Sequence, residues 1–112
     1  MIHPILKNKL PSVYAVLKKY KVKQAYVFGS IVTDDFDNNS DIDLLITLQD
    51  NLEPGEYEYT DCFWGLYFEL PEILGRPVDL VMSETVKNPF FKKSLDNSKE
   101  LIYESESKEV SF

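Results

Sequence analysis

The sequence is poor in the residues that build disulfides, zinc sites and membrane spans. Its 112 residues include one cysteine, Cys62, and one histidine, His3. A single cysteine cannot form an internal disulfide and suits a reducing compartment, and zinc prefers His and Cys ligands, so neither feature is expected. No apolar run reaches the ~20 residues that cross a bilayer, and the N-terminus lacks the apolar segment of a signal peptide. We therefore expect a cytoplasmic globular protein without a membrane partner.

Positive charge is also scarce. The chain has 12 Lys and Arg against 19 Asp and Glu, a formal net charge of −7. Such a surface repels polyanions, so a long nucleic acid is not an expected partner unless a local basic patch reverses the field. With 44% hydrophobic residues the chain can bury one core and is too short for two. We predict a single domain over residues 1–112, with 104–112 as a frayed polar tail.

Apolar spacing and turn residues predict the order of the elements. A short lead-in over 2–9 precedes a helix from Leu10 or Pro11 to Tyr20, and then follow a strand (Gln24–Phe28), a turn after Gly29-Ser30, a loop (34–40), a strand (Asp41–Leu48), an irregular stretch (Gln49–Tyr57), a helix (Cys62–Leu74) with Thr60 or Asp61 as N-cap, a strand (Val78–Met82), a helix (Pro89–Leu95) and a short strand (Leu101–Tyr103). This order predicts an α/β (α+β) fold, a small mixed sheet with helices packed on one face. The helix over Cys62–Leu74 has apolar residues on more than one face, so we expect it to be largely buried.

Two aspartates open the second predicted strand. The alternation of side chains in a strand places Asp41 and Asp43 on one face, about 7 Å apart, where they repel each other unless a cation lies between them. Asp79 stands inside the apolar pattern of the third strand, which is costly unless its carboxylate meets water or a cation. If the two strands are neighbours, three carboxylates share one face. Hard oxygen ligands of this kind suit Mg²⁺ or Mn²⁺.

A Gly-Ser pair ends the first predicted strand. Gly29 allows a close approach of the backbone to a phosphate, and backbone N–H groups with the Ser30 hydroxyl can donate to its oxygens. A phosphate at this turn, with divalent ions on the carboxylates, is the two-metal arrangement for phosphoryl or nucleotidyl transfer.

The combination resembles a known family. Gly29-Ser30, ten residues and Asp41-x-Asp43, with a later Asp79 in a strand, look like the nucleotidyltransferases related to DNA polymerase β. The short chain and the segment Leu74–Val81 are similar to the minimal nucleotidyltransferases (MNT), usually encoded beside a helical HEPN partner. The resemblance implies the polymerase β-like nucleotidyltransferase fold and transfer of AMP from ATP with Mg²⁺, two ions being expected. By position, Asp41 and Asp43 would bind the metal, Asp79 would be the third carboxylate, and Gly29 and Ser30 would bind the phosphates.

The resemblance also implies a partner. In toxin–antitoxin members the acceptor is a tyrosine of the HEPN toxin, and the transferase is the antitoxin, which predicts a hetero-oligomer. One alternative is an antitoxin that neutralises the toxin by binding, with weak catalysis or none. Another is a transferase acting on a small-molecule hydroxyl. The complete set of Asp41, Asp43 and Asp79 favours the enzyme, because neutralisation by contact does not need three carboxylates on one face.

Several other residues have an ordinary structural interpretation that we favour. We expect Trp64, Phe63 and Tyr67 in the core rather than as a shelf for adenine, and Cys62 as a small buried hydrophobe. Lys92 and Lys93 fit a solvated helix face better than a triphosphate site. Arg76 suits a surface ion pair at least as well as a phosphate, and the aspartates at 34, 35 and 37 suit a solvated loop.

Overall fold

The computed structural model describes residues 3–33, 35–37 and 39–105. These residues form a four-stranded sheet with the strand order β3-β2-β1-β4, four α-helices and two 3₁₀ turns. The elements are α1 (Pro4–Lys7), α2 (Leu10–Lys19), β1 (Val22–Phe28), η1 (Gly29–Val32), β2 (Ile42–Leu48), α3 (Tyr57–Leu74), β3 (Val78–Met82), η2 (Ser83–Thr85), α4 (Pro89–Ser98) and β4 (Glu100–Glu104). The predicted order of the main helices and strands is confirmed.

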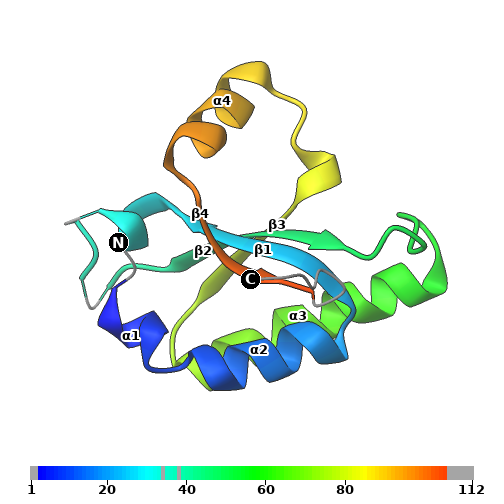
Figure 1. Ribbon diagram of the computed structural model, residues 1–112, viewed down its shortest axis with the longest axis horizontal. Coiled ribbons are helices and arrows are strands. Elements are labelled where there is room, and N and C mark those ends of the chain that lie inside the picture. The colour runs from blue at the N-terminus through cyan, green and yellow to red at the C-terminus, as the bar shows by residue number, and fades with distance from the viewer. Residues whose placement is uncertain (1–2, 34, 38, 106–112) are drawn as a thin grey trace.

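The sheet is mixed, as expected. Strand β1 pairs antiparallel with both β2 and β4, whereas β2 and β3 are parallel, joined by the crossover through α3. Helices α2 and α3 lie together along one side of the sheet, and α4 stands on the opposite side (Figure 1). The sheet thus has one face covered by two helices and another face with only α4 over part of it.

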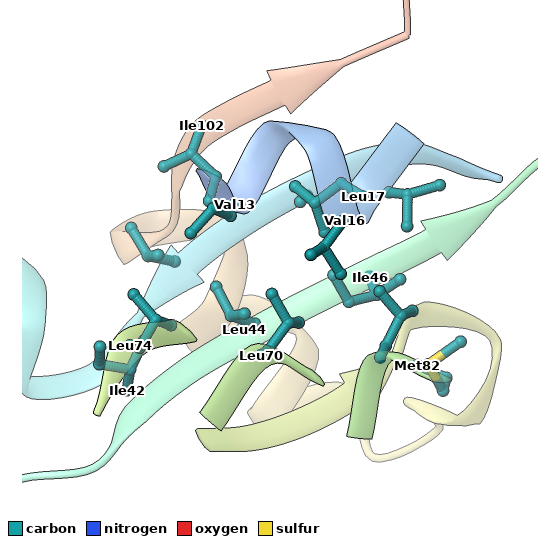
Figure 2. Packing of buried hydrophobic residues seen from close by; sticks show 14 of the residues in the cluster. Val13, Val16, Leu17, Ile42, Leu44, Ile46, Leu70, Leu74, Met82 and Ile102 are labelled. Carbon is teal, nitrogen blue, oxygen red and sulfur yellow. The ribbon is translucent and has the colours of Figure 1, made fainter. Parts of the chain in front are cut away.

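The core lies between the sheet and the helices α2 and α3. Strand β2 provides its centre, because Ile42, Leu44 and Ile46 alternate toward the helices and are completely buried. They meet buried side chains of α2 and α3, among them Leu17 and Leu70 (Figure 2). This apolar contact fixes which side chains of β2 face the helices, and therefore which face away from them.

Helix α3 begins one turn earlier than predicted and is less buried than predicted. Its N-cap is Glu56, whose side chain makes no capping hydrogen bond, and Thr60 and Asp61 lie inside the helix, so both expected caps are wrong. An ion pair between Glu58 in the first turn and Lys21 tethers this end to the segment before β1. The N-terminus of the helix is held by a contact distant in sequence, which no local pattern reveals.

The aromatic residues of α3 do not all enter the core. Cys62 is buried, as predicted, together with Leu66, Leu70 and Leu74, and Phe63 is half-buried against the core. Trp64 and Tyr67 are exposed instead of buried. The helix has more apolar surface than the sheet can cover, so the surplus faces outward.

The remaining differences are small. Strand β1 starts at Val22, α4 continues to Ser98, and Glu104, expected in the tail, is the last residue of β4. Ser105, also expected in the tail, is buried, and its backbone N–H donates to the carbonyl of Lys23 at 2.9 Å. The rest of the predicted tail, 106–112, lies outside the described residues. Among the helices that the structure describes, none is long and apolar enough to cross a membrane.

Candidate active site

The end of β1 and the starts of β2 and β3 meet at one edge of the sheet. In the register of the sheet, Asp43 of β2 lies between Phe28 of β1 and Asp79 of β3. Directly paired residues project from the same face, so Asp43 and Asp79 share the face that points away from α2 and α3. The neighbours of Asp43 in the chain, Ile42 and Leu44, are fully buried on the other face. The predicted adjacency of these two strands is therefore found.

Asp41 lies just outside this strand pair. Strand β2 begins at Ile42 rather than at Asp41, and the backbone N–H of Ile42 donates to the carbonyl of Pro77, 3.1 Å away. Asp41 is exposed directly before this bond. It is close enough to Asp43 for its charge to act on that carboxylate. All three predicted carboxylates thus belong to one edge of the sheet.

The electrostatics of Asp43 reflect this crowding. Burial, and then the charges of Asp79 and Asp41, raise the pKa of Asp43 from 3.8 to about 6. Part of the burial comes from Phe28, which is paired with Asp43 and contacts the ring of Phe91 on α4 at a centroid distance of 6.3 Å. A bound cation would relieve the repulsion between the carboxylates, and their oxygen atoms are the ligands that Mg²⁺ prefers. In the part of the chain that the structure describes, no three acidic, His or Cys side chains are already gathered at metal-ligand distances.

The Gly-Ser turn packs directly against Asp43. Gly29 has a left-handed φ of +77°, and a Cβ built on it would overlap Oδ2 of Asp43 and lie 3.2 Å from its Cγ. Only glycine therefore fits at this point without displacing the carboxylate. Ser30 follows in η1, where its carbonyl accepts bonds from the backbone N–H and the hydroxyl of Thr33, both at 2.9 Å. The Ser30 hydroxyl makes no hydrogen bond to another described residue.

Arg76 holds the loop that leads to Asp41. Its Nη1 donates to the carbonyls of Asp37 and Ser40, at 3.1 and 2.9 Å, and its guanidinium lies 4.7 Å from the ring centroid of Phe36. The ring of Phe36 also contacts His3, at a centroid distance of 4.8 Å. The predicted ion pair of Arg76 is not found among the described residues: Nη1 donates to both backbone carbonyls, and the buried Nε has no hydrogen-bond partner among these residues.

A cavity of about 130 Å³ lies on the same face of the sheet as Asp43, between β1, β2 and α4. Tyr26 and Thr47 line it from the sheet, and Lys92 and Lys99 line it from α4. From the sequence alone, Lys92 and Lys93 were candidates for a triphosphate site, whereas Tyr26, Thr47 and Lys99 were not. The period of two along β1 and β2 could have placed Tyr26 and Thr47 on the face of Asp43, whereas the position of α4 over that face had no sequence signal.

Similarity to known proteins identifies the family. Carboxylates at the starts of two parallel strands, beside a Gly-Ser turn, define a site of the nucleotidyltransferase class. The chain matches the family described as "Polymerase beta, Nucleotidyltransferase" over residues 12–108, and it belongs to that family. A relative from Methanocaldococcus jannaschii, named "Putative protein adenylyltransferase MJ1379", is 38% identical over 85 residues, which cover 76% of this chain and 79% of the relative.

Two solved complexes have a similar fold. A crystal structure described as a toxin–antitoxin with AMP-PNP has a TM-score of 0.65 at 21% identity, covering 88% of this chain and 75% of the other. A tri-AMPylated Shewanella oneidensis HEPN toxin in complex with an MNT antitoxin gives 0.60 at 18% identity, covering 90% of this chain and 74% of the matched chain. At these identities the likeness concerns the fold alone.

Proposed function

We propose that this chain transfers the adenylyl group of ATP to a hydroxyl of another protein, most simply a tyrosine of a HEPN-domain partner, and so acts as an antitoxin. The observation that carries the proposal is the register pair of Asp43 and Asp79 with Gly29 packed against Asp43. This pair brings acidic and phosphate-binding groups, far apart in sequence, to one edge of the sheet. The name of the Methanocaldococcus jannaschii relative and the AMPylated Shewanella oneidensis toxin support the choice of nucleotide and acceptor.

Each group has a distinct role in this reaction. The backbone at Gly29 and Ser30 binds the phosphates that leave as pyrophosphate. The acceptor oxygen forms a bond to the α-phosphorus while the bond from that phosphorus to the bridging oxygen of the β-phosphate breaks. Asp79, the most exposed carboxylate of the strand pair, accepts the proton of the acceptor hydroxyl. Asp43 and Asp41 would hold a divalent cation, which would supply positive charge to the triphosphate.

Mg²⁺ fits the donor set. Asp41, Asp43 and Asp79 would hold it, and Mg²⁺ would neutralise charge on the triphosphate and acidify the attacking hydroxyl. The raised pKa of Asp43 supports a cation here, because a site of repelling carboxylates gains most from one. Zinc is not favoured, since neither Cys62, buried in the core, nor His3, tilted against Phe36, belongs to this edge.

The test is mass spectrometry of the proposed HEPN-domain partner, after incubation with the chain, ATP and Mg²⁺. We expect a mass increase of one AMP residue for each modified tyrosine, and peptide mapping identifies the acceptor. The double variant Asp41→Asn/Asp43→Asn should abolish the increase. Asp50→Asn is the matched control, because Asp50 follows the opposite end of β2 and pairs with Lys23.

The same variants separate the enzyme from its alternative. If the double variant still neutralises the HEPN protein as well as the unchanged chain does, contact rather than transfer is the mechanism. A modified tyrosine lost in the double variant and kept in Asp50→Asn supports the enzyme.

A further inference from the structure

The outer face of α3 exposes a cluster of aromatic side chains. Trp64, Tyr67 and Phe68 are 47%, 46% and 67% exposed, yet their rings contact one another, with centroid distances of 5.2 to 5.9 Å. Pro71 follows one turn later beside them. We call these four residues the α3 aromatic patch. Trp, Tyr and Phe side chains are enriched at protein interfaces, and Trp and Tyr are enriched among their binding hot spots.

The patch continues into a groove that leads toward the active site. Tyr67, Phe68 and Pro71 line this groove, of about 290 Å³, together with Pro77 and Val78. Val78 opens β3, the edge strand of the sheet, and directly precedes Asp79. A protein that covers the patch and fills the groove therefore has a segment next to the proposed catalytic edge.

Charge indicates what kind of protein fits. Helix α3 contains four acidic residues and no basic residue. Glu69 pairs with Lys19 of α2, and Glu58 pairs with Lys21, which lies between α2 and β1. Asp61 and Glu72 are exposed on the border of the patch and have no ion pair with another described residue. A second copy of this chain, also of net charge −7, would oppose acid to acid, whereas a partner with Lys or Arg around an apolar surface complements the patch.

We infer that the α3 aromatic patch docks the acceptor protein, through an apolar surface of that protein bordered by Lys and Arg. The inference rests on the proposed function, because an acceptor protein must bind where one of its hydroxyls reaches the edge of Asp43 and Asp79. Docking on α3 leaves the face of the sheet with these carboxylates open to ATP. The acceptor protein would thus bind on the side of β3 that faces α3, and the transfer reaction would take place on the opposite face of the sheet.

The experiment measures binding of the proposed HEPN-domain partner to this chain. Trp64 is the only tryptophan in the sequence, so a chain labelled with 5-fluorotryptophan reports on the patch through one ¹⁹F resonance. We expect the resonance to shift when the HEPN protein is added. Phe68→Glu should raise the dissociation constant about thirtyfold or more, as the loss of a hot spot does. Asp61→Lys should weaken binding less, and its effect should shrink as salt is added.

The matched control is Phe90→Glu. Phe90 is 85% exposed on α4, on the opposite side of the sheet, so the same change of chemistry there should leave binding unaltered (Figure 1). All variants are first checked for unchanged urea unfolding and unchanged affinity for AMP-PNP. Equal binding by Phe68→Glu and the unchanged chain would overturn the inference while leaving the proposed function intact.

Further outcomes separate the two proposals. If the chain binds through the patch but no AMP is transferred, the docking inference stands and the proposed reaction fails. If the unchanged chain neither binds nor modifies the HEPN protein, both fail. If the chain alone sediments as a dimer that Phe68→Glu dissociates, the patch is a self-association surface and the inference is wrong.

Discussion

The contact between Gly29 and Asp43 leads to a prediction that does not depend on the reaction. In Gly29→Ala, the new methyl group meets two obstacles. The left-handed φ of +77° costs an alanine roughly 1–2 kcal/mol. The methyl group also overlaps Oδ2 of Asp43, which must leave its position beside the turn. An off-rotamer side chain costs about 0.5–1.5 kcal/mol more. We expect a total loss of about 2–3 kcal/mol in the free energy of unfolding.

Gly75→Ala is the matched control. Gly75 ends α3 with a φ of +69°, but a Cβ there has no other atom within 4 Å. It therefore has the backbone cost without the overlap, so we expect a loss of about 1–2 kcal/mol. Urea unfolding, monitored by far-UV circular dichroism, measures both. In addition, Gly29→Ala should slow adenylyl transfer about a hundredfold, because a displacement of about 1 Å at the reacting groups has such an effect. Gly75→Ala should leave the rate unchanged.

A double-mutant cycle isolates the overlap. In an Asp43→Ala background, Gly29→Ala should cost about as much as Gly75→Ala, because the obstructing carboxylate is gone. If Gly29→Ala costs no more than Gly75→Ala in the unchanged protein, and the Asp43→Ala background makes no difference, the turn does not press on the carboxylate and our reading of the site is refuted.

Three further predictions concern the same edge of the sheet. Arg76→Lys should lower adenylyl transfer about tenfold with little loss of stability, since an ammonium keeps the charge but not the planar guanidinium that lies over Phe36 while Nη1 holds the loop before Asp41; equal rates would contradict this role. The second prediction compares the unchanged protein with Asp43→Asn in the absence of divalent cations. Between pH 4 and 7, the unchanged protein should lose about 1 kcal/mol of unfolding free energy relative to the variant, after allowance for solvent screening. The sign follows from the pKa of Asp43, which is about 6 in the folded protein and 3.8 for an ordinary aspartate. Folding therefore favours the protonated carboxyl, and stability is lost as the pH rises and Asp43 ionises. A flat difference in urea titrations would refute it. Mg²⁺ at a hundred times its dissociation constant should restore about 2.7 kcal/mol to the unchanged protein and to Asp50→Asn but not to Asp43→Asn, as thermal shift would show.

The central part of the fold could be predicted because its signals are local. The alternation in Ile42–Leu48 and the glycine after Phe28 fix a strand, a turn and a second strand within the chain segment itself. A helix between two strands is typical of a parallel crossover, but the sequence leaves open whether the two strands are neighbours. Their pairing and the register that places Asp43 beside Asp79 are known only from the structure.

The start of α3 and the exposure of its aromatic residues depend on the rest of the molecule. The first turn of α3 is tied down by Lys21, which precedes β1, so the sequence near Glu56 contains no capping signal. Trp64 and Tyr67 were expected in the core because they are apolar. An apolar side chain gains free energy from burial, but its apolar character does not show whether this chain or a binding partner buries it. Exposed aromatics of this kind can be found only when the packing is known.

Stability and the proposed site depend on a single register. Ile42 and Leu44 are fully buried against α2 and α3, and a slip of one residue in β2 would expose both while driving Asp43 into the core. The apolar side of the strand therefore holds Asp43 beside Asp79, although their mutual repulsion opposes this arrangement. This explains how a small fold can maintain a crowded carboxylate pair before any cation binds. Core burial on one face of β2 stabilises the fold enough to offset the repulsion between the carboxylates on the other face. In the proposed reaction, a bound cation would relieve that repulsion.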